Sequence, residues 1–152
     1  MRLLIQRVRS ASVAVEGSIV SQIGHGFLVL AGFGKGDAES SITKLADKCL
    51  NLRVFEDDNG KMNLSLLDVG GEILIVSQFT LYADCRKGRR PGFDMSMPPD
   101  EAGRFYDLLL QEFRKSGLKV EKGVFAAKMQ INLTNDGPVT ILLDDNELQQ
   151  HR

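Results

Sequence analysis

The chain has 152 residues, which fits one domain, because a single hydrophobic core usually organises roughly 100–200 residues. Hydrophobic residues make up 43% of the chain and charged residues 26%, so neither a disordered nor a low-complexity protein is expected. The net charge of −1 excludes a general positive field for nucleic acid, and any RNA binding must come from a local basic patch.

The N-terminal segment and the cysteines indicate the compartment. The apolar run Leu3–Ile5 is too short for a signal peptide, and no stretch approaches the ~20 apolar residues of a membrane span. Cys49 and Cys85 are the only cysteines, and they lack the Cys-x-x-Cys spacing of a redox or zinc motif. The sequence therefore predicts a cytoplasmic protein without a membrane partner.

The first third of the chain has the pattern of β-structure. Leu3–Val8 and Ser12–Val15 are short β-rich runs, and Glu16-Gly17 forms a plausible tight turn into a third run at Ser18–Ile23. The continuous apolar run Phe27–Ala31 predicts a strand that is buried on both faces.

A helix is expected next, with Asp37 as its N-cap. Its apolar stripe has helical spacing and comprises Ile42, Leu45, Ala46, Cys49 and Leu50. Arg53–Phe55 resembles a short strand closed by the turn Asp57–Gly60. A second strand buried on both faces is expected from Glu72 to about Leu81.

The segment Asp84–Pro99 is rich in charge, Gly and Pro, which predicts a loop. A second helix should start near Pro99, with acidic residues in its first turn and Gly117 just past its end. Its expected buried face comprises Ala102, Phe105, Tyr106, Leu109 and Phe113.

Three more strands are expected near Leu118–Glu121, Lys128–Thr134 and Val139–Leu143, and the polar tail Asn146–Arg152 should be frayed. No internal repeat or linker is present. We therefore predict an α/β fold with one domain over residues 1–145, in which two main helices cover a strand-rich body, followed by the polar tail 146–152.

The end of the strand from Glu72 carries the first candidate site. Its side chains are apolar on both faces until Ser77, Gln78 and Thr80, where they become polar. This pattern is typical of a strand end that opens into a cleft. A strand that surfaces at its natural end, with Thr as a β-favouring residue, has the same pattern.

The second candidate is Asn135–Thr140, which lies between two β-runs. A hairpin turn explains most of this segment. Pro138 is unusual because it directly precedes a β-run, where it cannot donate a ladder hydrogen bond. A Gly-Pro bond such as Gly137–Pro138 can also be cis.

The third candidate is the basic run Arg86–Arg90, which could hold tRNA phosphates or could be a solvated loop. The histidines argue against several enzyme classes. His25 lies between glycines and His151 lies in the tail, so neither suits the base of a Ser/His/Asp or Cys/His arrangement. No residues have the spacing of a catalytic metal site or of a phosphate-binding glycine loop, so no metal and no cofactor are expected.

The segments Ser77–Leu81 and Asn135–Thr140 together resemble the two signature motifs of the D-aminoacyl-tRNA deacylases, called D-tyrosyl-tRNA deacylases in older naming. Further segments occur in the family's order, namely Gln6–Val8, Ala11–Val15, Gly60–Asn63 and Gly123–Met129. The resemblance covers nearly the whole chain, and two separate motifs at the right separation make it specific.

The resemblance implies a three-layer α/β/β domain that works as a homodimer on D-aminoacyl-tRNA, and that also cleaves glycine esters. By position, Gln78, Phe79 and Thr80 would hold the terminal adenosine and the scissile ester. Gly137 and Pro138, joined by a cis bond, would reach into the partner's pocket and face the α-carbon of the amino acid. The other residues expected at the substrate are Ser77, Phe125, Met129, Asn135 and Arg7, the last of which would buttress the cis-proline loop.

The implied chemistry is compatible with the missing histidine. An aminoacyl ester is already activated, so its hydrolysis needs positioned water and hydrogen-bond donors for the oxyanion. Backbone N–H groups near Phe79 and Thr80 could be those donors, and the 2′-hydroxyl of the terminal adenosine could activate the water. Because Thr80 lacks an adjacent base, we expect it to position the substrate rather than attack it. The alternatives are a non-catalytic tRNA-binding or RNA-binding module that uses Arg86–Arg90, and a cysteine hydrolase built on Cys85.

Overall fold

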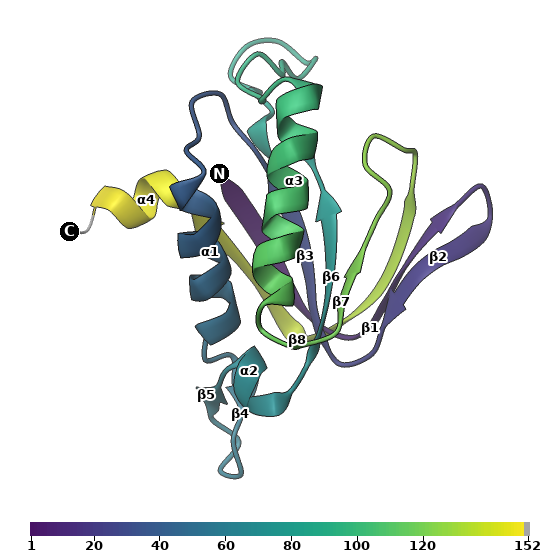
Figure 1. The fold of residues 1–152 in the computed structure, drawn as a ribbon, viewed down its shortest axis with the longest axis vertical. Coiled ribbons are helices and arrows are strands. Elements are labelled where there is room, and N and C mark those ends of the chain that lie inside the picture. Colours follow the sequence, from purple (N-terminus) through teal and green to yellow (C-terminus); the bar gives the residue numbers. More distant parts are fainter. Residues whose placement is uncertain (151–152) are drawn as a thin grey trace.

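A long N-terminal strand organises the sheet in the computed structural model, which describes residues 1–150 (Figure 1). The strands of the main sheet are β1 (Arg2–Val15), β2 (Ser18–Ile23), β3 (Gly26–Gly32), β6 (Glu72–Ser77), β7 (Val120–Lys122) and β8 (Gln130–Asp144). One edge of β1 pairs with β8 along almost its whole length. The other edge pairs antiparallel with β3 over residues 2–8 and with β2 over residues 11–15. Strand β6 is parallel to β3, and β7 is parallel to β6.

Two pairs of runs predicted as separate strands are continuous. The first is β1, because Ser10 and Ala11, in the expected gap, pair with Thr134 and Leu133 of β8. The second is β8, because residues 136–139 leave the ladder only locally, between the pairs Val8–Asn135 and Gln6–Thr140.

Strands β3 and β6 are buried on both faces, as their continuous apolar runs predict. In β6, Ile73 and Ile75 point into the larger core beneath the helices. Leu74 and Val76 point into a smaller core on the opposite face. That smaller core comprises Val8, Ala11, Val13, Ile23, Leu28, Leu74 and Val76. The sheet thus curls over itself into a nearly closed, barrel-like body, with a helical layer on its other face.

Two main helices, α1 (Ser40–Asn51) and α3 (Pro99–Arg114), cover one face of the sheet (Figure 1). Every member of both predicted apolar stripes is buried, which confirms the helical spacing. Within residues 1–150, no helix is both long and apolar enough to cross a membrane.

The remaining elements are short. The hairpin of β4 (Phe55–Glu56) and β5 (Met62–Leu64) surrounds the predicted turn. It leads to α2 (Leu66–Val69), which the sequence analysis did not predict and which has a capping box between Ser65 and Asp68.

Two expectations about the helices are wrong. Asp37 is not the N-cap of α1, because its carboxylate accepts hydrogen bonds from the Met1 amino group at 2.8 Å and from the Gly34 backbone N–H at 2.6 Å. Residues 145–150 are not frayed but form α4 (Asp145–Gln150). The Asp145 carboxylate, which is buried, accepts hydrogen bonds from Ser41 and Lys44 of α1 and anchors this helix. His151 and Arg152 lie outside the described residues.

The strand expected to run to about Leu81 ends at Ser77. A short 3-10 helix, η1 (Phe79–Tyr82), follows it, so the predicted alternation of faces stops before Gln78. The chain turns here because the Leu81 N–H donates to the Gln78 carbonyl at 3.2 Å instead of continuing the ladder.

Candidate active site

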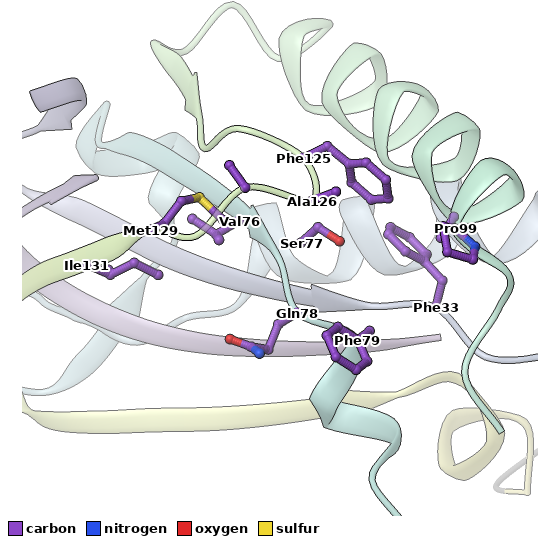
Figure 2. A pocket seen from close by; sticks show the side chains of 12 residues that line it. Phe33, Val76, Ser77, Gln78, Phe79, Pro99, Phe125, Ala126, Met129 and Ile131 are labelled. Atoms are coloured by element: carbon purple, nitrogen blue, oxygen red, sulfur yellow. The ribbon is translucent and has the colours of Figure 1, made fainter. Parts of the chain in front are cut away.

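A pocket of about 420 Å³ opens where the carboxyl ends of β3 and β6 meet (Figure 2). It is lined by Phe33, Val76, Ser77, Gln78, Phe79, Pro99, Ala102, Phe125, Ala126, Ala127, Met129 and Ile131. None of these residues has an ionisable side chain. Figure 2 shows Ser77 in the middle of the lining, with Phe33, Phe125 and Pro99 toward one end and Val76, Met129 and Ile131 toward the other. The pocket therefore offers apolar walls with a few neutral polar groups, as binding sites for small organic ligands do.

The sharp turn after β6 forms one side of the pocket, and Gly32 allows it. The Gln78 N–H donates to the Ala31 carbonyl at 2.8 Å, which holds the turn against the end of β3. A Cβ atom at Gly32 would lie 2.8 Å from Cβ of Leu81 and 3.1 Å from the Gln78 carbonyl oxygen. Only glycine lets the two segments approach this closely.

The segment 123–129, between β7 and β8, forms the opposite side. The Gly123 N–H donates to the Ile75 carbonyl at 3.1 Å, and the Tyr106 hydroxyl of α3 donates to the same oxygen at 2.6 Å. The Tyr106 ring stacks on Phe125 with centroids 6.0 Å apart. Burial raises the pKa of Tyr106 to about 12. The neutral hydroxyl thus fixes the strand end, and its ring supports the pocket wall.

Five of the sequence-predicted site residues line this pocket, namely Ser77, Gln78, Phe79, Phe125 and Met129. Thr80 does not line it. Thr80 is exposed in η1, where its Oγ1 accepts a hydrogen bond from Nε2 of Gln78. The backbone N–H groups of Phe79 and Thr80 lie in the first turn of η1, where a helix provides no carbonyl acceptors of its own.

The other predicted residues form a second cluster, on β1 and β8. Gln6 pairs with Thr140 and Val8 pairs with Asn135, so Arg7 alone faces the segment 136–139. This segment is a bulge in β8 that presents Gly137 and Pro138 to solvent. The Gly137–Pro138 bond is cis, as the resemblance implies. No residue of this bulge lines the pocket in the same chain.

Side chains hold the bulge firmly. Arg7 is buried and donates from Nε to the Asp136 carbonyl at 2.8 Å and from Nη1 to the Val54 carbonyl at 2.5 Å. The Asn135 amide bridges the base of the bulge, because its Oδ1 accepts from the Val139 N–H at 2.8 Å and its Nδ2 donates to the Val139 carbonyl at 3.1 Å. The exposed tip therefore stands on a rigid base.

Neither cysteine lies in the pocket lining. Cys49 is fully buried in α1, and burial raises its pKa far above the ordinary value, which favours the inert thiol. Cys85 is exposed in the loop after η1. Among residues 1–150, no three His, Cys, Asp or Glu side chains gather in a way that could hold a metal ion.

Comparison with known proteins decides the family. A family model described as D-Tyr-tRNA(Tyr) deacylase matches residues 4–144. The D-aminoacyl-tRNA deacylase of Thermosipho africanus (strain TCF52B) is 57% identical over 148 residues, which cover 97% of this chain and 99% of that one. The chain belongs to the D-aminoacyl-tRNA deacylase family.

A second curated relative has the same name, and a solved structure has the same fold. The D-aminoacyl-tRNA deacylase of Halothermothrix orenii (strain H 168 / OCM 544 / DSM 9562) is 56% identical over 97% of this chain and 99% of its own. A solved structure, the c-Myc DNA Unwinding Element Binding Protein, superposes with a TM-score of 0.90 at 44% identity, and covers 95% of this chain and 99% of that one. This deacylase is therefore an enzyme, a hydrolase, and not a non-catalytic RNA-binding module.

Two pocket residues of this deacylase, Phe33 and Pro99, are not among the site residues predicted from the sequence. Phe33 directly follows the buried run of β3, and the carboxyl ends of parallel strands meet at one edge of a sheet. A prediction that β3 and β6 pair in parallel would therefore have made Phe33 a candidate pocket residue. Pro99 was identified only as a helix start, because its contact with the pocket depends on how α3 packs.

Proposed function

We propose that the pocket at the end of β6 holds the terminal adenosine of D-aminoacyl-tRNA and the ester to be cleaved. The observation that carries the proposal is the pocket itself, with about 420 Å³, apolar walls and no ionisable lining residue. A base and a ribose need flat apolar surfaces and a few polar anchors, and Phe79, Phe125 and Met129 provide the former. Ser77 and Gln78 provide the latter.

Catalysis then depends on positioning. The backbone N–H groups of Phe79 and Thr80 are free to donate to the developing oxyanion, which is the group that most needs stabilisation in ester hydrolysis. The substrate's own 2′-hydroxyl activates the water, because the pocket lining offers no general base. The Thr80 hydroxyl accepts a hydrogen bond from the Gln78 amide and so orients the Gln78 side chain. Thr80 does not act as a nucleophile.

The working unit is a homodimer in which Gly137 and Pro138 of one subunit complete the pocket of the other. Three features support this arrangement. The bulge is exposed, it is held rigidly by Arg7 and Asn135, and it does not line the pocket of its own chain. Rigid backbone placed against the α-carbon excludes an L side chain by collision, whatever that side chain is.

Exclusion by collision has a consequence for substrate range. Glycine has no side chain to collide, so glycyl-tRNA is also cleaved. D-amino acids of different sizes are accepted, because the side chain points away from the excluding backbone. We place this proofreading step in the cytoplasm, where aminoacyl-tRNAs are used.

Deacylation of matched substrates tests the activity. Purified protein should release D-tyrosine from D-Tyr-tRNA and should release negligible L-tyrosine from L-Tyr-tRNA, with a metal chelator present throughout. Equal rates on the two enantiomers would refute the collision mechanism.

Subunit mixing tests the shared site. Gly137→Ala should displace the wall that the bulge provides for the partner's pocket, and Gln78→Ala should damage the pocket of its own subunit, so each homodimer should be nearly inactive. Coexpression of the two variants should restore about a quarter of the wild-type sites, because half of the dimers are mixed and each has one intact pocket. A mixture as inactive as its parents would refute the exchange between subunits.

A further inference from the structure

A basic loop that carries one exposed aromatic ring, Phe93, lies beside the pocket. Residues 84–96, here called the rim loop, follow η1. Backbone hydrogen bonds between Asp84 and Gly92, at 2.7 and 2.9 Å, close the base of the loop. The Ser96 hydroxyl donates to the Phe79 carbonyl at 3.2 Å, which ties the end of the loop to the pocket. The rim loop is therefore attached to the site at both ends.

The basic residues of the rim loop are not equivalent. Arg86 donates from Nε and Nη2 to the Asp84 carboxylate, both at 2.8 Å, and these bonds lower the pKa of Asp84 to about 2. Arg86 is thus committed to shaping the loop. Lys87, Arg89 and Arg90 are exposed and form no ion pair with a carboxylate in the described part of the chain. Three uncompensated positive charges thus stand at the tip of the loop.

Two exposed aromatic rings, one in the pocket lining and one in the rim loop, pack against each other. Phe79 lines the pocket and is 56% exposed, and Phe93 of the rim loop is 39% exposed. Their centroids are 4.9 Å apart with an interplanar angle of 67°. Large exposed aromatic side chains beside unpaired cations are the combination that binds single-stranded nucleic acid, because bases stack on the rings and phosphates contact the cations.

We propose that the rim loop binds the unpaired nucleotides that precede the terminal adenosine of tRNA. A base stacks on Phe93, next to the adenosine that enters past Phe79, and Lys87, Arg89 and Arg90 contact the phosphates that follow. This inference rests on the proposed function of the pocket. It explains how a protein with a net charge of −1 attracts a polyanion, because the attraction is confined to the mouth of the site.

Substrates of increasing length separate the rim loop from the pocket. We would measure kcat/KM on D-tyrosyl-adenosine, on D-tyrosyl-CCA trinucleotide and on D-Tyr-tRNA. Phe93→Leu keeps an apolar contact with Phe79 but lacks a ring, and it should lower kcat/KM about tenfold on the two longer substrates. It should leave D-tyrosyl-adenosine within about twofold, and Phe93→Tyr should retain wild-type values on all three. An equal loss on all three substrates would overturn the proposal. If the wild-type protein failed to cleave D-tyrosyl-adenosine, the proposed pocket would be at fault instead.

Salt dependence tests the cations, with a control of equal charge loss. The rim variant changes Lys87, Arg89 and Arg90 to Gln, and the control variant changes Lys48, Lys61 and Arg114 to Gln. The control residues are exposed and belong to the carboxyl ends of α1 and α3 and to the β4–β5 hairpin, at the opposite end of the molecule from the rim loop (Figure 1).

Uncharged tRNA is the ligand in this assay. The slope of log K against log salt should become shallower by about 2 in the rim variant, at about 0.7 for each lost contact to single-stranded phosphate. The control should keep the wild-type slope. Equal slopes in the rim variant and wild type would refute the phosphate contacts.

Cys85 supplies a readout that does not depend on activity. Cys85 is exposed within the rim loop, whereas Cys49 is fully buried. The rate at which the native protein is alkylated should therefore be the rate at Cys85. Uncharged tRNA should slow this alkylation at least about fivefold at low salt, and the protection should disappear at high salt. Alkylation at the same rate with and without saturating tRNA would show that the loop remains free, and would overturn the proposal.

Discussion

The bulge at Gly137 offers the sharpest perturbation of this enzyme. Gly137 has φ +151°, a conformation that side chains rarely adopt, and a Cβ atom there would lie 2.8 Å from both the backbone nitrogen and Cγ2 of Val139. The backbone conformation costs about 1–3 kcal/mol for a residue other than glycine. Overpacking against a fixed neighbour adds a cost of about 1–3 kcal/mol. Gly137→Ala should therefore lower the free energy of unfolding by on the order of 3 kcal/mol, which a protein of ordinary stability tolerates.

The effect on activity should be larger than the effect on folding. If the bulge faces the α-carbon in the partner's pocket, a displacement of about 1 Å should reduce kcat/KM on D-Tyr-tRNA at least about hundredfold. Affinity for uncharged tRNA should stay the same, because the bulge contacts the amino acid and not the nucleotides.

Gly60→Ala is the matched control for this substitution. Gly60 also has a positive φ, +73°, and nothing lies within 4 Å of its would-be Cβ, so alanine there tests a strained backbone without the collision. It should lose about 1–2 kcal/mol of stability and keep full activity. Urea denaturation and steady-state deacylation would be measured for both variants. If Gly137→Ala lost no more activity than Gly60→Ala, the bulge would have no part in the site.

Four further outcomes are expected. Cys85→Ser and Cys49→Ala should each keep kcat within about tenfold, or ~1.4 kcal/mol of barrier, because neither thiol lies in the pocket; a larger loss in a folded variant would revive the cysteine hydrolase. Thr80→Ala should retain measurable activity, whereas D-Tyr-tRNA ending in 2′-deoxyadenosine should be cleaved slowly; the reverse pair of results would make Thr80 the nucleophile. Tyr106→Phe should cost about 1 kcal/mol in urea denaturation, because the Ile75 carbonyl keeps the Gly123 N–H. Because burial raises the pKa of Tyr106 from 10 in the unfolded chain to about 12 in the folded protein, the unfolded chain loses this proton first as pH rises. The free energy of unfolding of the wild type should therefore fall between about pH 10 and about pH 12, and it should fall less in Tyr106→Phe.

Periodicity predicted the parts of the fold in which one face or both faces are buried. The stripes of α1 and α3 and the doubly buried runs of β3 and β6 were found because burial there is regular along the chain. The end of β6 was predicted wrongly for a physical reason. Ser77–Leu81 has the composition of a strand, but the hydrogen bond from Leu81 to the Gln78 carbonyl and the space left by Gly32 turn it into η1. Tertiary contacts of this kind leave no local signal.

The candidate site, too, could be predicted only in part from local sequence patterns. Polarity at the end of β6 pointed to Ser77 and Gln78, but only the resemblance to a family connected them with Gly137 and Pro138. The structure explains why no pattern in one chain could do so, because the two groups lie in separate clusters. The rim loop was recognised as a basic run. Its division into one structural arginine and three free cations depends on the hydrogen bonds of Asp84, which composition does not reveal.

The burial of β6 on both faces affects which parts of the enzyme unfold locally in the native state. Amide protons of residues 73–75 have core on either side and partner strands on both edges, so their exchange with solvent should require global unfolding. Amides of the rim loop have few such partners and should exchange through small local openings. The floor of the site would then be among the last parts of the molecule to open, whereas the exposed tip of the rim loop opens locally. A deacylase of this kind can admit and release a large substrate without loosening the surface on which the ester is aligned.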